Sequence, residues 1–419
     1  MCSQVSIVYD YMLTYNNNLY QNQQRSLELP DQTHQTHDTH ICRIRQEMPA
    51  TTSQLYFNAG TFGPLPTSAL QAMQQRLQGE YTQGRLGAAA WEAIHAIYDN
   101  ARRSVAHLLN ADVSEIALTG NTGEGMNIVS YGLNWQQGDE VITTNHEHYN
   151  ALGPLYQIRD RFSITLRFAD IGTAGEQPAL KAIADLVTPR TRLIVLSHVL
   201  WTTGALVNVS EICSIGREYG IPVLVDGAQS AGAIPVDVKA LGADYYAIPM
   251  QKWLCGPDGT GALYVSREAL NAIHSTYVGY PSIEHEEGVE WTLKKNAQRF
   301  EMGGTHPAAI AGQAAALQWL EETVGYPWLF NRISSLSRYA YSALKAIPGL
   351  TMLTPVAGDS GLISFRLEGR DETDVVTKLQ KKHNIYIRNI PSLKSLRVST
   401  GFYNTEEEID TLVKALEEL

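Results

Sequence analysis

The segment from Ile221 to Val265 constrains the fold of this chain more than any other. It contains three short apolar runs of strand length, at 222–225, 245–249 and 261–266. The first run is followed by Asp226, and the second is followed by Gln251 and Lys252. Open α/β sheets bind ligands at the carboxyl ends of their parallel strands. We therefore expect an acid and an amine at one ligand-binding edge of such a sheet.

A carboxylate and a lysine in this arrangement suit pyridoxal 5′-phosphate (PLP). A lysine amine bonds covalently to the aldehyde carbon of the cofactor. A carboxylate facing the pyridine nitrogen keeps it protonated, so that the ring can accept electrons. Taken singly, Lys252 would more often be a solvated lysine and Asp226 a helix-capping aspartate. Their order and the glycines around them favour a PLP site.

These residues belong to motifs that resemble the class V aminotransferase and cysteine desulfurase group of PLP enzymes. The motifs are DGAQSAG, from Asp226, and QKWLCGPDGTGALYV, from Gln251. LSHVLWTTGALVNVSEI, STYVGYPSI, QRFEMGGTHP and IYIR are similar to segments of cyanobacterial L-cysteine/cystine C–S lyases within that group. Sequences described as isopenicillin N epimerase-like share much of this pattern. The resemblance runs from about Leu55 to the C-terminus.

The resemblance implies an α/β fold, the PLP-dependent fold type I. The large PLP-binding domain, residues 53–310, would contain a mostly parallel seven-stranded sheet between helices. Its first part, residues 53–85, would pack near a small α+β C-terminal domain. Residues 311–419 would supply a linking helix and that small domain. The resemblance also implies a homodimer with composite active sites.

Composition limits the possible partners. The net charge is −11 and the chain has no basic block, which argues against nucleic acid or an anionic membrane as a partner. Four scattered cysteines, Cys2, Cys42, Cys213 and Cys255, fit neither a disulfide framework nor a zinc motif. No apolar run reaches the length of a membrane span. We expect a cytoplasmic protein.

Residues 1–52 differ from the rest of the chain, being rich in Asn, Gln, Thr and His. This composition predicts a disordered N-terminal extension. His34, His37 and His40 have a spacing that could bind metal, although polar His tracts usually bind nothing specific. The start lacks the pattern of a signal peptide. One hypothesis is that translation begins at Met48.

Periodicity and end signals predict the remaining elements. Helices are expected at 67–83, 88–109 and 308–324, and strands at 115–119, 139–144, 191–198, 361–366 and 385–387. A C-terminal helix should begin at Glu406, with Thr405 and Glu408 forming a capping box.

The turn Asn121-Thr122-Gly123 leads into a helical pattern. The N-terminus of a helix offers free N–H groups and a favourable dipole to a phosphate. The resemblance implies that the phosphate of PLP binds here. Gly123 is added or shifted relative to the usual motif, which leaves open which hydroxyl contacts the phosphate.

The resemblance assigns further cofactor contacts. Gln229 would donate to the ring hydroxyl oxygen of PLP, and Thr305 would reach the phosphate of the neighbouring subunit. Gln251 stands where the group usually has a histidine, and its amide can still donate. We expect somewhat weaker cofactor affinity.

His146 and His148 follow a predicted strand and are two residues apart, so their side chains would point the same way. The resemblance assigns ring stacking on PLP to His148. A rival hypothesis is a metal-dependent hydrolase built on His146, His148, His198 and Asp226. The Ser197 region lacks a nucleophile-elbow pattern, so Ser197, His198 and Thr203 would line the substrate pocket.

Arg388 and Arg397 are the candidates for binding the substrate carboxylate. A guanidinium fork grips a carboxylate through two parallel hydrogen bonds. Surface arginines are more usual, but the nine-residue spacing equals that of the corresponding pair in the C–S lyases. Asn58, in a segment that would run past the active site, is a further substrate-binding candidate.

The absence of cysteines after Cys255 decides between reactions. Cysteine desulfurases use a nucleophilic cysteine in the region after Ile385, whereas C–S lyases need none. The sequence therefore favours β-elimination from L-cystine or L-cysteine to pyruvate, ammonia and a persulfide or sulfide. An aminotransferase, an epimerase and a non-catalytic cofactor-binding relative are the alternatives on the same scaffold.

Overall fold

A computed structural model describes residues 32–419, with side chains from residue 39 onward. Contacts divide the chain into two units, 1–46 and 47–419. The described part of the first unit is helix α2 (Gln32–Gln46). Residues 1–31 of the predicted extension, which include Cys2, lie outside the described residues. The side chains of His34 and His37 also lie outside them.

The prediction of disorder up to residue 52 is wrong for the described part of that segment. Residues 32–46 form α2, and α3 (Ala50–Ser53) follows in the second unit. The backbone carbonyl of Glu47 accepts from the Thr67 N–H at 2.7 Å, and Met48 is fully buried. Single residues that contact the rest of the fold cannot be recognised in a segment rich in Asn and Gln, because each contributes little to the average hydropathy of the segment.

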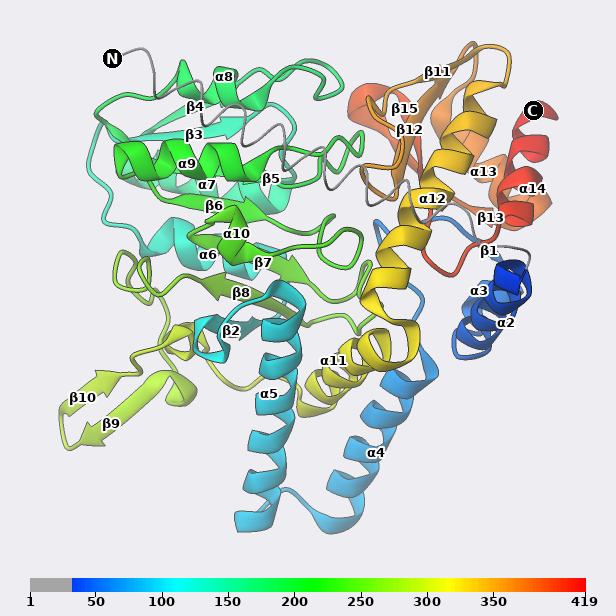
Figure 1. Cartoon of the computed structure of the whole chain (residues 1–419). Helices are drawn as coiled ribbons and strands as arrows, with labels where there is room; N and C mark the ends of the chain where they lie inside the picture. Colours follow the sequence, from blue (N-terminus) through cyan, green and yellow to red (C-terminus); the bar gives the residue numbers. More distant parts are fainter. Residues whose placement is uncertain (1–31) are drawn as a thin grey trace. The chain divides into compact units, whose positions relative to one another are not determined.

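A seven-stranded sheet forms the centre of the second unit, as predicted (Figure 1). Its strands are β2 (Ile116–Thr119), β3 (Glu140–Thr144), β4 (Thr165–Ala169), β5 (Thr191–Ser197), β6 (Val223–Asp226), β7 (Tyr245–Pro249) and β8 (Gly261–Val265). They lie in the order β2-β8-β7-β6-β5-β3-β4, and β8 alone is antiparallel to its neighbours. Every residue of β6, β7 and β8 is buried, as expected for strands covered on both faces.

Helices α6 (Thr122–Gly132), α7 (Tyr149–Phe162), α8 (Ala179–Ala184) and α9 (Val209–Tyr219) contact strands of this sheet, and α10 (Val238–Leu241) contacts α9. Helix α5 (Ala88–Leu109) contacts the edge strand β2, which follows the 3₁₀ turn η1 (Val113–Glu115). Helix α4 (Thr67–Gln83) extends away from the sheet beside α5 (Figure 1). In Figure 1, α9 lies on the near face and α6 and α7 on the far face. Met126 of α6 and Leu155 of α7 pack with Val195 and Leu224 of the strands in one apolar core. The predicted bounds of α4 and α5 are confirmed to the residue.

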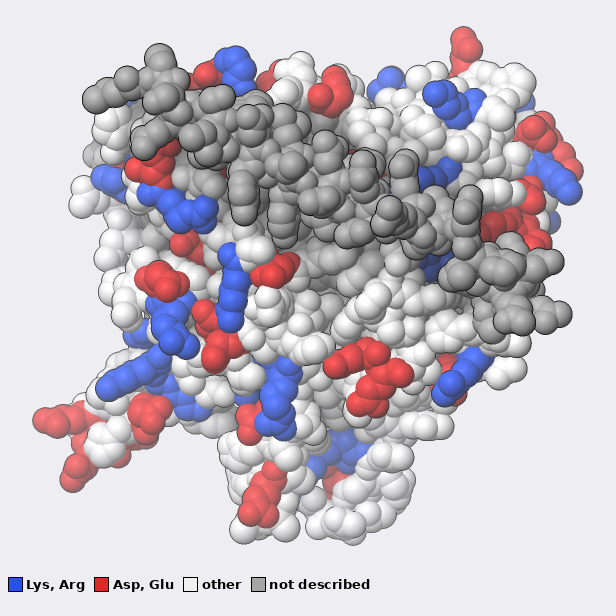
Figure 2. Space-filling view, in the orientation of Figure 1, with Lys and Arg blue, Asp and Glu red and all other residues white. Residues whose placement is uncertain are grey.

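A hairpin of β9 (Ile283–Glu287) and β10 (Glu290–Leu293) was not predicted. It lies between the 3₁₀ turns η2 (Tyr280–Ser282) and η3 (Ala297–Phe300). Its strands are mostly exposed and carry Glu284, Glu286, Glu287 and Glu290. Figure 2 shows this acidic tip at the lower left, while acidic and basic side chains are interspersed over the rest of that face.

The C-terminal part begins with α11 (Pro307–Trp319), which continues as a π-helical turn, η4 (Leu320–Val324). After it come α12 (Tyr326–Lys345), β11 (Leu350–Met352), β12 (Leu362–Leu367), α13 (Glu372–His383), β13 (Ile385–Tyr386), β14 (Arg388–Ile390), η5 (Pro391–Leu393), β15 (Ser395–Ser399) and α14 (Glu406–Glu417). An antiparallel sheet has the order β11-β12-β15-β14. The capping box of Thr405 and Glu408 is confirmed.

Two sets of contacts join the C-terminal part to the preceding part of the second unit. Strand β1 (Leu55–Tyr56) pairs in parallel with β13, and Phe57 enters the C-terminal core. The four successive carbonyls of residues 201–204 each accept a side-chain hydrogen bond from the C-terminal part. In chain order the donors are Arg397, Ser364, Thr354 and Ser360, at 2.5, 2.5, 2.7 and 2.8 Å. Among the described residues, no helix is both long and apolar enough to cross a membrane.

Candidate active site

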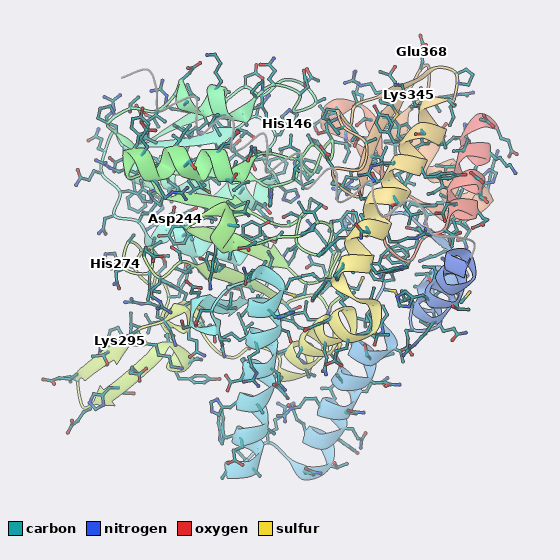
Figure 3. The ribbon with its side chains drawn as sticks, viewed as in Figure 1. His146, Asp244, His274, Lys295, Lys345 and Glu368 are labelled. Atoms are coloured by element: carbon teal, nitrogen blue, oxygen red, sulfur yellow. The ribbon has the colours of Figure 1, made fainter. Side chains whose placement is uncertain are left out.

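The candidate site lies at the carboxyl edge of the seven-stranded sheet. Strands β3, β5, β6 and β7 are parallel, so the segments after Thr144, Ser197, Asp226 and Pro249 emerge at the same edge. Figure 3 shows His146, two residues after β3, at the side of the sheet that faces the C-terminal elements. The sheet topology thus gathers most of the predicted site residues.

Asp226 and Lys252 meet at this edge. Asp226 is the last residue of β6, is buried, and accepts the Ala228 N–H at 2.9 Å. Burial raises the pKa of Asp226, and the positive charge of Lys252 opposes that rise. Desolvation lowers the pKa of Lys252 to about 8, with Asp226 acting against it and the two arginines Arg397 and Arg388 adding to it. The amine is therefore partly neutral near physiological pH.

The turn at residues 58–63 crosses the site beside Lys252. The Gly63 N–H donates to the Gln251 carbonyl at 2.7 Å. A Cβ at Gly63 would lie 2.0 Å from the Lys252 carbonyl oxygen, so only glycine permits this approach. The Gly60 carbonyl accepts from Gln229 Nε2 at 2.8 Å.

Gln229 and Gln251 differ in how their amides are used. Gln229 is buried and bridges two elements, since its Oε1 also accepts from Trp253 Nε1 at 2.9 Å. Its second amide hydrogen remains for a ligand. Gln251 Oε1 is buried and has no hydrogen-bond partner among the described residues. Such an orphaned acceptor is expected where a ligand or water completes the site.

His148 is the N-cap of α7 and accepts the Asn150 N–H on Nδ1 at 3.1 Å. Its ring meets Trp201 edge-on, with 5.2 Å between the ring centroids. Burial lowers the pKa of His148 to about 4, and the charges of Lys252 and the two arginines add to this effect. The imidazole is consequently neutral at physiological pH.

The metal-dependent alternative is not supported by the geometry. His146 uses Nδ1 with Thr202 Oγ1 at 3.1 Å and Nε2 with the Gly172 carbonyl at 2.6 Å. His198 Nδ1 is 2.8 Å from the Tyr246 hydroxyl. In the part of the chain that the structure describes, no three His, Cys, Asp or Glu side chains are arranged to hold a metal.

Two residues expected to line the substrate pocket are instead bonded within the protein. The Ser197 hydroxyl donates to Glu147 at 2.5 Å, and the Thr203 hydroxyl donates to the Ala174 carbonyl at 2.8 Å. Glu147, which the sequence did not single out, is buried and also accepts from the Thr144 hydroxyl at 2.6 Å. Burial raises the pKa of Glu147 to about 7, and the charge of Asp226 adds to the rise.

Arg388 and Arg397 lie directly opposite each other on β14 and β15. Arg397 is completely buried and donates from Nη1 to the Trp201 carbonyl at 2.5 Å. The Cζ atom of Arg388 is 5.6 Å from the Trp201 ring centroid. Among the described side chains, no carboxylate lies within ion-pair distance of either arginine. Burial lowers the pKa of Arg397 to about 9, and the Arg388 charge adds to this effect.

Thr61 joins these two arginines, and the sequence did not reveal it. Its Oγ1 accepts from Arg388 Nη1 at 3.3 Å and from Arg397 Nη2 at 3.4 Å. The same hydroxyl donates to Asn58 Oδ1 at 2.8 Å. The arginines are 327 and 336 residues away in the chain, so no local pattern could have indicated the contact.

The turn after β2 has the geometry expected of a phosphate site. Asn121 is the N-cap of α6, and Thr122 and Gly123 are its first residues. The first N–H groups of a helix have no partner within the helix. A Cβ at Gly261 of β8 would lie 2.9 Å from the Asn121 Cα and 2.7 Å from the Ile248 carbonyl of β7, which brings this turn beside the strand before Lys252.

Thr305 is the one predicted site residue that this chain does not bring to the edge. Its hydroxyl is hydrogen-bonded to that of Tyr98 in α5. Among the described residues, no hydrogen bond joins Thr305 to Lys252, Asp226 or α6.

Comparisons with known proteins agree with this architecture. The family described as "Aminotransferase class-V" matches residues 55–412. A probable cysteine desulfurase of Methanothermobacter thermautotrophicus is 29% identical over 393 residues, covering 90% of this chain and 97% of its own.

Two solved structures have similar folds. The cystine C–S lyase C-DES, in complex with its reaction product cysteine persulfide, has a TM-score of 0.85 and 34% identity, covering 89% of this chain and 99% of that chain. The cysteine desulfurase CsdA of Escherichia coli has a TM-score of 0.80 and 28% identity, covering 90% of this chain and 98% of that chain. The chain described here belongs to the aminotransferase class-V family.

Proposed function

We propose that this chain is a PLP-dependent carbon–sulfur lyase that catalyses β-elimination on L-cystine and L-cysteine-type substrates. The observation that carries the proposal is the pair of half-buried Lys252 and buried Asp226 at the carboxyl edge of the seven-stranded sheet. Two arginines of the C-terminal sheet act on the charge of Lys252 and have no carboxylate partner among the described side chains. Similarity to C-DES, whose structures include the cystine C–S lyase with cysteine persulfide and a variant with glycine covalently linked to PLP, supports it.

The residues at this edge fit PLP. Asp226 would face the pyridine nitrogen, Gln229 would donate its second amide hydrogen to the ring hydroxyl oxygen, and the neutral His148 would lie against the ring. The N–H groups of Thr122 and Gly123, with Asn121 and Gln251, would hold the phosphate. When bound, PLP supplies an electron sink for the charge that develops at the substrate Cα.

Lys252 has two tasks in this proposal. Its neutral amine would hold the cofactor covalently, and as a free amine Nζ would take the proton from the substrate Cα. A pKa of about 8 suits an amine that must alternate between free base and ammonium. The positive charge of Lys252, which opposes the rise in the pKa of Asp226, favours the carboxylate form that would face the ring nitrogen.

The arginines orient the substrate. Arg388 and Arg397, with Asn58 beside them, would bind the α-carboxylate and fix the Cα–H bond relative to Lys252. The sulfur substituent at Cβ would then depart with the electrons of its bond to Cβ, and water would hydrolyse the released enamine to pyruvate and ammonia.

The cysteines argue for lyase rather than desulfurase chemistry. No cysteine follows Cys255 in the sequence, and Cys255 is completely buried, with burial raising the pKa of its thiol. A buried, protonated thiol is a poor nucleophile. Sulfur would therefore leave on the substrate fragment, as cysteine persulfide from cystine and as sulfide from cysteine.

The same proposal includes a homodimer, in which Thr305 of one protomer contacts the phosphate in its partner's site. The segment that carries Thr305 is held in place by hydrogen bonds within its own chain. Glu301 accepts from Arg102 at 3.0 Å and from the Leu118 N–H at 2.9 Å, and Thr305 is bonded to Tyr98.

Product analysis tests the proposed reaction. Holoenzyme incubated with L-cystine should release pyruvate, ammonia and sulfane sulfur, and a panel of Cβ-thio amino acids should rank the leaving groups by pyruvate yield. The Lys252→Ala variant is the control for release without enzyme chemistry. Amino-group transfer to a keto acid, or inversion at Cα, without pyruvate release under saturating PLP would refute β-elimination.

A further inference from the structure

The hydroxyl of Thr61 occupies a position between two cations, the completely buried Arg397 and the half-buried Arg388. It is the acceptor that Arg388 and Arg397 share, through Nη1 and Nη2 respectively. Two guanidinium groups in one poorly solvated site repel each other, and an acceptor between them reduces the cost of holding them together.

The direction of the Thr61 hydroxyl is fixed by Asn58. Because the hydroxyl proton points to Asn58 Oδ1 at 2.8 Å, the oxygen lone pairs are left for the two arginines. If the hydroxyl proton pointed toward one of the guanidinium groups instead, the hydroxyl dipole would repel that cation.

Thr61 cannot move independently of the active site. The Gly60 carbonyl is bonded to Gln229, and the Gly63 N–H is bonded to the Gln251 carbonyl. On the other side, the Phe57 carbonyl accepts the Ser399 N–H at 2.8 Å. A Cβ at Gly60 would approach Arg397 Nη2 to 3.1 Å, which shows how tightly the turn fits against that arginine. The turn therefore ties the arginines to the segment that carries Lys252.

The two arginines have different freedom to bind a ligand. Arg397 is held by the Trp201 carbonyl and by Thr61, whereas Arg388 is half-buried and rests on the Trp201 ring. Arg388 is therefore the arginine with more freedom to turn toward a carboxylate, while Arg397 is fixed by the Trp201 carbonyl.

We propose that Thr61 is a specificity-determining residue, which positions the two guanidinium groups to accept substrates that carry an α-carboxylate. It acts through the arginines and does not itself take part in bond breaking. The inference rests on the proposed function, since it assumes that the arginines bind the substrate carboxylate.

Two aminooxy reagents test this role on the PLP-loaded enzyme. Aminooxyacetate carries a carboxylate and O-methylhydroxylamine does not, and the reaction of each is followed by loss of the bound cofactor's absorbance band. In Thr61→Val, which keeps the side-chain shape but removes the hydroxyl, the second-order rate constant for aminooxyacetate should fall about tenfold. In the same variant, the second-order rate constant for O-methylhydroxylamine should stay within about twofold of the wild-type value. Thr61→Ser, which keeps the hydroxyl, should restore the rate constant for aminooxyacetate.

The outcomes separate this inference from the function on which it rests. Equal rates for aminooxyacetate in the wild type and in Thr61→Val, or an equal decline for both reagents, would overturn the role of Thr61. A wild-type protein whose absorbance responds to neither reagent would instead contradict the PLP enzyme itself. Thr61→Ala serves as a second hydroxyl-free variant if Thr61→Val does not fold.

Discussion

At the scale of single residues, burial shifts the pKa values of several ionisable groups in the site. Lys252 lies among Asp226, Arg388 and Arg397, and desolvation is the largest influence on its pKa. Glu147 and Asp226 are both buried carboxyl groups, but Glu147 is bonded to two hydroxyls, whereas Asp226 interacts with Lys252. These environments lead to two predictions about pH.

The first concerns the rate at which the apoprotein takes up PLP. Only the neutral amine attacks the aldehyde, so the rate should rise with pH, with a midpoint near 8, and level off above it. Arg388→Gln removes a positive charge that lowers the pKa of Lys252, so the midpoint should move to higher pH. Arg366→Gln, an exposed arginine on β12, is the matched control and should leave the midpoint unchanged. An uptake rate that is independent of pH between 6.5 and 9.5 would show that the amine is not the titrating group.

The second concerns stability and Glu147. Its pKa is about 7 in the folded protein and lies near the ordinary value of 4.5 in the unfolded chain. Between these values the unfolded chain releases a proton that the folded protein keeps, so the contribution of Glu147 to the free energy of unfolding is lost as pH rises. Glu147→Gln removes this loss, and its stability relative to wild type should increase by about 1.4 kcal/mol per pH unit in that window. Urea unfolding of both apoproteins at pH 5 and pH 7 measures it, and equal pH slopes would contradict the assignment.

At the scale of elements, the turn at residues 58–63 links the C-terminal part to the edge of the seven-stranded sheet. It connects β1, which pairs with β13, to the residues beside Lys252. Its close approach to the Lys252 carbonyl depends on the absence of a side chain at Gly63.

Gly63→Ala should therefore destabilise the protein by about 1–3 kcal/mol or more and weaken PLP binding, because the added Cβ must displace the Lys252 backbone. Gly79→Ala is a matched control in helix α4, where an added Cβ meets nothing within 4 Å. It should stabilise the helix by about 0.5–1 kcal/mol. Thermal unfolding and PLP titration of both variants measure the difference between them. Gly63→Ala protein that bound PLP as tightly as wild type would contradict this prediction.

The elements that the sequence predicted well carry local signals. Helix α5 was predicted to the residue because its apolar period ends at Asn110, which takes a left-handed conformation. Strands β6, β7 and β8 were predicted within one or two residues, since short apolar runs are bounded by polar and glycine-rich turns.

Features that depend on distant contacts could not be predicted in this way. The pairing of β1 with β13, the shared contact of Thr61 with both arginines, and the burial of Glu147 arise only when the chain is folded. The helix at 32–46 was missed because its composition is polar throughout, with few apolar residues to reveal a period.

At the scale of the whole molecule, the proposed homodimer makes a prediction about mixed subunits. Lys252→Ala and Thr305→Ala chains, unfolded and refolded together, should form some dimers with one intact site, built from Lys252 of one chain and Thr305 of the other. Lyase activity should then exceed the sum for the separate variants. If Thr305 acts in its own chain, or not at all, mixing will produce no gain.

The central claim is that the Lys252 amine holds PLP against Asp226. Its most direct test is borohydride reduction of the PLP-loaded protein, followed by proteolysis and mass spectrometry. We expect that the peptide containing Lys252, and no other lysine peptide, gains the mass of the reduced cofactor, and that Lys252→Ala gains none. A cofactor adduct on a different lysine, or an unmodified Lys252 peptide from fully loaded protein, would contradict it.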